Sequence, residues 1–305
     1  MGSPLLYVIV ATRAPVAVVF RRAQGWWLVS RWDLTTGDLE HGAWFRGTLY
    51  PRRCDLSPDG KLLCCFALQF SRREFMGQTG LHTYTAVSKL PWLFALAAWP
   101  ELGTWTRGSH FVEAEMPQRG ENVAQDECEA VEGWRALPGV RATWELGEPQ
   151  MGSIGPLRTR HGLGLLRTAP FQYANERRRG WVEHELCPPR GPGDLWDEKR
   201  SVVLEKPQPN GSGMLVLTDG GWSAEEARVE GRAPVYRLAK GRRRTELPEA
   251  RWADWDSKGR LLVATHDGRL QIRNVDAPDL STVREHDLGA LPPAPGPAPK
   301  SAQSW

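Results

Sequence analysis

One stretch of the sequence decides the fold: Cys54-Asp55-Leu56-Ser57-Pro58-Asp59-Gly60-Lys61-Leu62-Leu63-Cys64. Apolar residues stand on both sides of a polar segment centred on Gly60, and glycine supplies the positive φ that a tight turn between strands requires. Aspartate and serine side chains hydrogen-bond to the backbone of such turns. The stretch therefore predicts a β-hairpin with Asp59 and Gly60 in its turn.

The same pattern recurs further along the chain, as Ala253-Asp254-Trp255-Asp256-Ser257-Lys258-Gly259-Arg260-Leu261-Leu262-Val263. Weaker copies lead into apolar strands at Gly164 and at Gly213. When Gly60, Gly164, Gly213 and Gly259 are taken as turn anchors, the successive gaps are 104, 49 and 46 residues. The last two gaps match a propeller blade of roughly 40–50 residues, and the first is about two blades.

Asp267 and Gly268 predict one more hairpin, because an Asp-Gly pair before an apolar strand is a strong turn signal. Short strands at this spacing are typical of a sandwich, a barrel or a propeller, and the blade-length period favours the propeller. We therefore predict an all-β protein, a β-propeller of six blades with five or seven as alternatives. Ring closure removes open sheet edges, so we expect residues 5–10 to pair with strands of residues 261–275.

The two quoted turns resemble those of known propeller families. Ser57-Pro58-Asp59-Gly60-Lys61-Leu62-Leu63 resembles the first hairpin of a WD40-type or TolB-like blade, and Asp256-Ser257-Lys258-Gly259-Arg260-Leu261-Leu262 is similar to its counterpart in NHL-like blades. No blade ends in Trp-Asp with an upstream Gly-His pair, as WD40 blades do. The resemblance implies an architecture that scaffolds, binding proteins and enzymes all share, so it does not imply an activity.

The repeat pattern suggests how the chain is divided. Residues 1–288 are predicted to form a single β-propeller domain, and residues 289–305, rich in proline and without apolar periodicity, a disordered tail. Residues 113–140 interrupt the strand pattern as an irregular or helical insertion. Its acidic part, residues 113–132, is compatible with a helix and with a long loop between blades.

Composition indicates a globular protein of a reducing compartment. Apolar residues make up 41% of the chain and charged residues 25%. The five cysteines are odd in number and form no CxxC pair, which fits the cytoplasm. Residues 1–20 resemble neither a signal peptide nor a membrane span. We expect a cytoplasmic protein that does not contact membranes, and the excess of arginine over lysine suggests a GC-rich bacterial genome.

Local motifs for catalysis and cofactor binding are missing from the sequence. The stretch His161-Gly162-Leu163-Gly164 begins like a dinucleotide-binding loop, but Arg167 stands where the third glycine belongs. Gly152-Ser153-Ile154-Gly155 lacks the spacing of a nucleophile elbow. No Walker A loop is present. We therefore predict no cofactor and no metal site, and the sequence identifies no catalytic residue.

Four residues remain as candidates for binding: His184, His266, Arg178 and Arg243. His184 lies between two glutamates but lacks the second histidine of an HExxH motif, so an outward strand face explains it as well. His266 precedes an Asp-Gly turn and can equally be a plain turn residue. The arginines belong to residues 177–179 and 242–244, which suit a phosphate or an acidic protein surface or, alternatively, remain solvated.

The predicted function is that of a non-enzymatic scaffold that binds another protein, because a rigid ring displays loops for contact. Nucleic acid is not expected as a partner, since a net charge of +3 is small for a chain of 305 residues. One alternative is a propeller enzyme, of hydrolase or lyase type, with histidines and carboxylates at the mouth of the channel. Another is a propeller that binds a small ligand or carbohydrate in a Trp-lined pocket.

Overall fold

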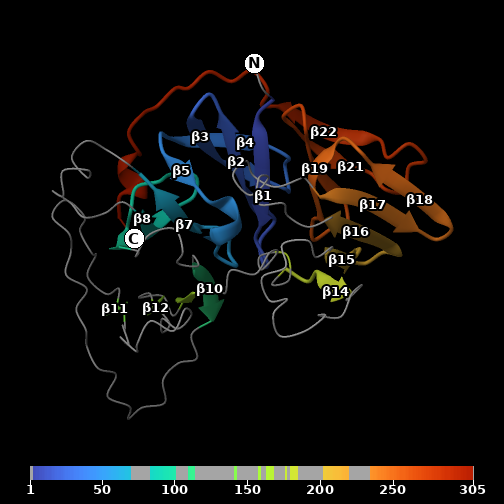
Figure 1. The fold of residues 1–305 in the computed structure, drawn as a ribbon, viewed down its shortest axis with the longest axis horizontal. Helices are drawn as coiled ribbons and strands as arrows, with labels where there is room; N and C mark the ends of the chain where they lie inside the picture. The colour runs from blue at the N-terminus through green and yellow to red at the C-terminus, as the bar shows by residue number, and fades with distance from the viewer. Residues whose placement is uncertain are drawn as a thin grey trace, which may run out of the picture. The chain divides into compact units, whose positions relative to one another are not determined.

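The computed structural model describes most of the two ends of the chain and short parts of its middle. The described residues are 3–69, 83–100, 109–113, 141–142, 157–158, 163–167, 176, 179–184, 202–219 and 234–304. Within them the fold is all-β, as predicted: the strands form antiparallel sheets of four or five strands (Figure 1). Among these residues, no helix is long and apolar enough to cross a membrane.

The chain falls into two compact units. Unit 1 comprises residues 1–8 and 176–291, and unit 2 comprises residues 9–175 and 292–305. The single domain predicted for residues 1–288 stays a prediction. The residues of the expected insertion between 114 and 140 lie outside the described part of the chain, as does the choice between helix and loop for its acidic segment.

The first sheet has the order β1-β2-β3-β4, and its members are Leu5–Val10, Val16–Ala23, Trp26–Asp33 and Leu39–Phe45. The second has the order β5-β7-β8-β9, with Thr48–Leu49, Leu62–Leu68, Thr83–Lys89 and Ala97–Pro100; β6 (Asp55–Leu56) also pairs with β7, and η1 (Pro51–Arg53) precedes β6. The third has the order β10-β13-β12-β11, with Ser109–Glu113, Leu163–Arg167, Leu157–Arg158 and Arg141–Ala142.

Two sheets of unit 1 keep the strands in chain order. One contains β14 (Val182–His184), β15 (Val202–Pro207), β16 (Gly213–Asp219), β17 (Val235–Lys240) and β18 (Arg243–Leu247). The other contains β19 (Ala250–Trp255), β20 (Leu261–Thr265), β21 (Arg269–Arg273) and β22 (Thr282–Asp287). Every residue of β20 is buried, whereas β22 is mostly exposed, so burial falls from the inner strands to the outer one.

The two hairpins that decided the fold are built alike. The backbone N–H of Gly60 donates to Ser57 O over 2.8 Å, and that of Gly259 donates to Asp256 O over 3.0 Å. Both glycines are left-handed, with φ of 72° and 76°. Ser57 Oγ accepts hydrogen bonds from the next strand, and Asp256 Oδ1 accepts the backbone N–H groups of Lys258 and Arg260. Glycine and a short polar side chain are thus what this turn requires.

A buried aspartate two residues before each of these turns ties neighbouring sheets together. Asp55 accepts the backbone N–H of Leu56 over 2.9 Å and, with its other oxygen, that of Phe111 in β10 over 2.8 Å. Asp254 accepts the N–H of Trp255 over 2.7 Å and the ammonium of Lys206 in β15 over 2.6 Å. The sequence repeat is therefore also a repeat of interactions between sheets.

The third turn differs from the prediction. Gly213 is the first residue of β16, not the centre of the turn, and the left-handed residue is Asn210, with φ of 55°. Gly211 N donates to Gln208 O over 3.3 Å, so Gly211 is the counterpart of Gly60. Asparagine adopts the left-handed region more readily than most residues with a side chain, so the left-handed residue lies three positions before Gly213.

The pairing expected for the N-terminal strand is also wrong. Strand β1 pairs with β2, whereas β20 and β21 lie between the other strands of their own sheet. Within unit 1 the start of the chain nevertheless packs on the β20–β21 turn: a Cβ placed on Gly268, whose φ is 94°, would lie 2.4 Å from Pro4 Cγ. Contact is made through side-chain packing, because both edges of β20 and β21 are already hydrogen-bonded.

Residues 289–304, part of the expected disordered tail, make contacts with the rest of the described chain. They include η4 (Lys300–Ala302), and the side chain of Ala302 is 3% exposed. Lys89 Nζ in β8 donates to Ser301 O over 2.9 Å. A proline-rich segment shows no apolar periodicity in its sequence, but its backbone loses little conformational entropy on folding. A few contacts are therefore enough to order it.

The bond between Asp254 and Lys206 predicts a large loss of stability on Asp254→Ala. The variant leaves a largely buried ammonium and a buried backbone N–H without an acceptor, and the free energy of unfolding is expected to fall by about 3 kcal/mol. Urea denaturation of the full chain measures it. The double variant Lys206→Met/Asp254→Leu should recover part of the loss, because it removes both charges. Asp276→Asn, which breaks an exposed ion pair, is expected to cost about 1 kcal/mol or less.

Candidate functional site

Four connections meet at one end of unit 1. These are the β15–β16, β17–β18 and β19–β20 turns and the loop from β21 to β22, and together they line a hollow of about 360 Å³. We call this surface, made by residues 208–212, 240–244, 256–260 and 274–279, the basic turn face. Polar side chains dominate the hollow, and none of its lining residues is aromatic.

Gln208 fixes two of the turns that form the hollow, the β15–β16 and β19–β20 turns, to each other. Its side-chain amide donates to Gly259 O over 2.7 Å, and its carbonyl oxygen accepts Gly213 N over 3.0 Å. A Cβ on Gly259 would lie 2.5 Å from Pro209 O, so only glycine permits this approach. The β15–β16 and β19–β20 turns therefore present their polar groups from fixed positions.

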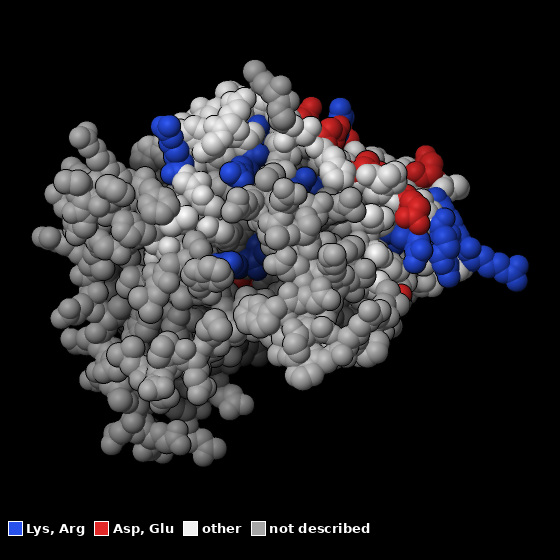
Figure 2. Space-filling view, viewed as in Figure 1, with Lys and Arg blue, Asp and Glu red and all other residues white. Residues whose placement is uncertain are grey.

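Positive charge gathers on the basic turn face. Its six cations are Lys240, Arg242, Arg243, Arg244, Lys258 and Arg260, and its three carboxylates are Asp256, Asp276 and Asp279, which leaves a net charge of +3. In Figure 2 a group of Lys and Arg side chains projects at the end of the β17–β18 hairpin, on the right of the view. The formal charge of the whole chain is also +3. The charges of all other residues therefore sum to zero, and the basic turn face carries the whole net excess.

The cations fall into two groups. Some are paired: Lys240 with Asp276, and Arg260 with Asp256, whose Oδ2 lies 2.6 Å from Arg260 Nη2. Arg243 donates to Thr245 Oγ1 over 3.0 Å and to Ala277 O over 3.3 Å, which ties the hairpin to the β21–β22 loop.

The second group comprises Arg242, Arg244 and Lys258. All three are exposed, and none forms an ion pair with a carboxylate in the part of the chain that the structure describes. Arg244 Nη1 donates only to backbone oxygens of its own hairpin, those of Gly241 and Arg243. These three side chains therefore keep their charge available to a ligand.

The four candidate binding residues do not come together. Arg243 lies on the basic turn face. His266 lies in the β20–β21 turn, at the opposite end of β20, and burial followed by the charge of Arg251 lowers its pKa. His184 is the last residue of β14, in register with Val203. Arg178 lies outside the described residues.

The sequence did not single out Lys258 and Arg260 as binding residues, although both belong to the repeated turn. The available signal was the repeat period itself. Because Gly211 and Gly259 occupy equivalent turns, their hairpins lie at the same end of neighbouring sheets, and so do the charged residues beside them.

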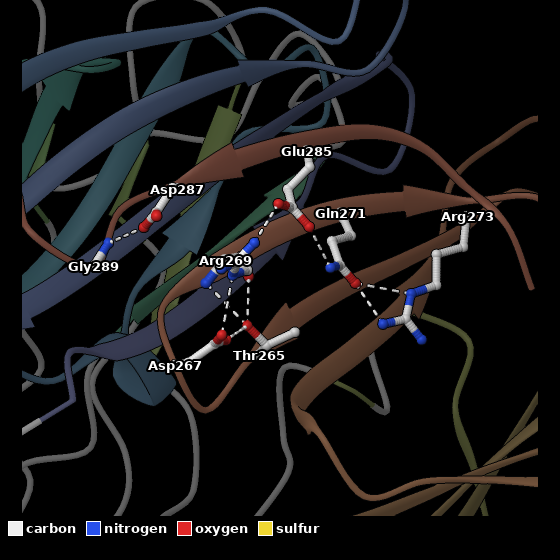
Figure 3. Close-up of polar contacts among 8 residues, drawn as sticks. All are labelled: Thr265, Asp267, Arg269, Gln271, Arg273, Glu285, Asp287 and Gly289. Carbon is white, nitrogen blue, oxygen red and sulfur yellow. Dashed lines mark hydrogen bonds and ion pairs between the residues drawn. The ribbon is translucent and has the colours of Figure 1, made fainter.

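Along the C-terminal sheet of unit 1, charged side chains pair with one another. Figure 3 shows a row of polar contacts over β20, β21 and β22. Arg269 bonds Asp267 and Glu285, Glu285 accepts from Gln271 over 2.6 Å, and Gln271 accepts from Arg273. Arg273 also pairs with Glu249 over 2.5 Å. This row stabilises the exposed outer strand and leaves little charge for a ligand.

The two alternative sites, enzymatic and carbohydrate-binding, stay predictions. In the described ranges, no three His, Cys, Asp or Glu side chains come together as a metal site would require. The hollow is lined by amides, hydroxyls and charged groups, whereas a carbohydrate site would offer an aromatic face.

No family model matches the chain, and no curated protein matches it. A 1.18 Å crystal structure of an uncharacterized protein from Listeria monocytogenes EGD-e is similar at 10% sequence identity and a TM-score of 0.31, over 95% of this chain and 84% of that chain.

The contacts in Figure 3 predict how the ionisation of Asp267 depends on its neighbour Thr265. The hydrogen bond from Thr265 is the main reason that the pKa of Asp267 lies below its ordinary value of 3.8. Because the pKa of Asp267 is lower in the folded state, its ionised carboxylate stabilises the fold at pH values above the ordinary pKa. This stabilisation is lost as the pH falls through the lowered pKa. In Thr265→Val, the pKa of Asp267 measured by carboxyl NMR should rise toward 3.8. An unchanged pKa would contradict this assignment.

Proposed function

We propose that the chain is a non-enzymatic interaction module with the β-propeller architecture that the repeat predicts, and that its basic turn face binds an acidic segment of a partner protein. The proposal rests chiefly on one observation: Arg242, Arg244 and Lys258 hold exposed positive charge beside a polar hollow, with no carboxylate paired to them among the described residues. On the rest of unit 1's C-terminal sheet, charges pair with one another instead.

Several features support the architecture. The two sheets of unit 1 and the first sheet of the chain run in sequence order, as the strands of a blade do. The Gly60 and Gly259 hairpins repeat both a turn and a buried aspartate that bonds a neighbouring sheet. The five sheets of the described residues fall within the predicted range of five to seven blades.

The chemistry of the face suits a protein better than a nucleic acid. Single-stranded nucleic acids bind to surfaces that offer aromatic rings for base stacking, and the hollow has none in its lining. Phosphate backbones favour uninterrupted positive charge, whereas Asp276 and Asp279 are interspersed among these cations. Amide and hydroxyl groups between the charges suit recognition of individual carboxylates.

We place the module in the cytoplasm and assign it no thiol chemistry. Cys54, Cys64 and Cys65 are buried free thiols, which fits a reducing compartment. Burial raises the pKa of Cys65 to about 12, so the reactive thiolate is scarce at neutral pH.

Binding of a fluorescein-labelled decaglutamate peptide to the full chain, followed by fluorescence anisotropy at low salt, tests the proposal. Arg242→Gln/Arg244→Gln should weaken binding about fivefold, since each exposed charge contact contributes roughly 0.5 kcal/mol. Affinity should fall further as salt is added, because the charges are exposed.

The matched control is Arg46→Gln/Lys300→Gln, which removes two exposed charges from unit 2 and changes the net charge by the same amount. It should leave the affinity for decaglutamate nearly unchanged. An equal loss in both double variants would overturn the proposal, since the peptide would then respond to net charge alone. Tighter binding of a short DNA duplex than of decaglutamate would overturn it too.

A further inference from the structure

We infer that the hollow of the basic turn face is a subsite for a single oxyanion, a carboxylate or phosphate group of the acidic partner, held between the ammonium groups of Lys258 and Lys240. The inference rests on the proposed function and assigns the group that this face recognises. Three observations on the turns around the hollow carry it.

First, the side chain of Lys258 is not needed by its own turn. In the equivalent hairpin the same position is Asp59, which accepts a hydrogen bond from Ser57 and pairs with Lys61. In both turns the glycine N–H donates to the carbonyl three residues earlier, and the glycine φ values are almost the same in spite of opposite charges at this position. Only the backbone N–H of Lys258 takes part in its turn, so the ammonium is available to a ligand.

Second, neutral donors line the hollow on the side facing Lys258. Among the described residues, the side chains of Asn210 and Ser212 form no hydrogen bond, and both border the hollow. Gln208 binds their turn to Gly259, the neighbour of Lys258. An amide, a hydroxyl and an ammonium group carried by turns that are bonded to each other suit an oxyanion, which accepts several short hydrogen bonds at once.

Third, Lys240 already holds a carboxylate that an incoming oxyanion can replace. Its ammonium pairs with Asp276, whose side chain is 77% exposed, whereas that of Lys240 is 25% exposed. The backbone N–H of Asp276 is held by Asn274 Oδ1 over 2.9 Å, but the carboxylate itself faces solvent. Asp276 therefore occupies the site as an internal competitor. Arg260 contributes no net charge, because Asp256 neutralises it.

The hollow admits more than the oxyanion alone. A volume of about 360 Å³ accommodates a carboxylate or phosphate together with the side chain that carries it. This geometry fits an acidic side chain that projects from a peptide lying across the turns, where Arg242 and Arg244 contact the flanking acidic residues.

The inference predicts effects of opposite sign from two residues of the hollow. In the full chain, Lys258→Gln should weaken decaglutamate binding about threefold to fivefold, and Asp276→Asn should strengthen it about threefold, because the competitor is gone. Asp279→Asn is the matched control: it lies on the same loop, is exposed and changes the charge equally, but does not line the hollow. It should change the affinity less than twofold.

Two small anions distinguish a phosphate from a carboxylate as the group that the subsite binds. Sodium phosphate and sodium acetate are titrated into labelled protein at constant ionic strength, and the backbone amide NMR signals of Gly211, Lys258 and Gly259 are followed. Saturable shifts with phosphate alone assign a phosphorylated partner, and shifts with both anions assign a carboxylate as well. Lys258→Gln should abolish the shifts. Equal shifts in that variant, or none with either anion in the unaltered chain, would overturn the subsite.

The acidic partner and the oxyanion subsite can be contradicted separately. If Arg242→Gln/Arg244→Gln weakens decaglutamate binding while Lys258→Gln and Asp276→Asn do not alter it, the acidic partner stands and the subsite is wrong. If Asp279→Asn strengthens binding as much as Asp276→Asn does, the effect is one of general charge and the subsite is again wrong. If no variant of the face alters binding, both are wrong.

Discussion

Within unit 1, the arrangement of the two sheets depends on the buried carboxylate of Asp254. It accepts the N–H of its own neighbour, Trp255, and the ammonium of Lys206 in the adjacent sheet, so one side chain joins two sheets and holds two donors away from water. The indole of Trp255 bonds Lys206 O over 3.0 Å beside it. This pair tolerates little displacement, because separation leaves the buried carboxylate of Asp254 desolvated without a counter-ion. The register of the two sheets follows from that constraint.

The hollow is a consequence of the same constraint. Lys206 lies two residues before Gln208, and Asp254 two residues before Asp256, so fixing the first pair brings the turns that follow them together. Gln208 and Gly259 then meet, and the cations of the β19–β20 turn lie beside the polar groups of the β15–β16 turn. The stabilising contact is buried and the binding surface is exposed, but only two residues of chain separate them. Loops placed by a rigid framework in this way commonly carry binding sites.

The sequence predicted the all-β class and the Gly60 and Gly259 hairpins because their determinants are local. A left-handed glycine and a short polar residue three positions earlier suffice. It misplaced the third turn because Asn210 can take the left-handed conformation that Gly213 was expected to supply. The hollow could not be predicted, because it depends on contacts between residues about fifty positions apart. His266 and Arg243 appeared equally good as candidates, yet β20 separates the ends on which they lie.

Comparison of the repeated turns shows where function can enter such a fold. Gly60 and Gly259, and Asp55 and Asp254, do the same work in both hairpins, so a repeat that changed them would lose its turn or its bond to the next sheet. Asp59 and Lys258 occupy equivalent positions with opposite charges. The side chain of Asp59 accepts the backbone N–H of Lys61, whereas only the backbone of Lys258 takes part in its turn, so the β19–β20 turn does not constrain this side chain. A position that the fold leaves unconstrained can carry whatever charge a partner requires. In this protein that freedom coincides with a hollow lined by polar donors from turns that Gln208 joins.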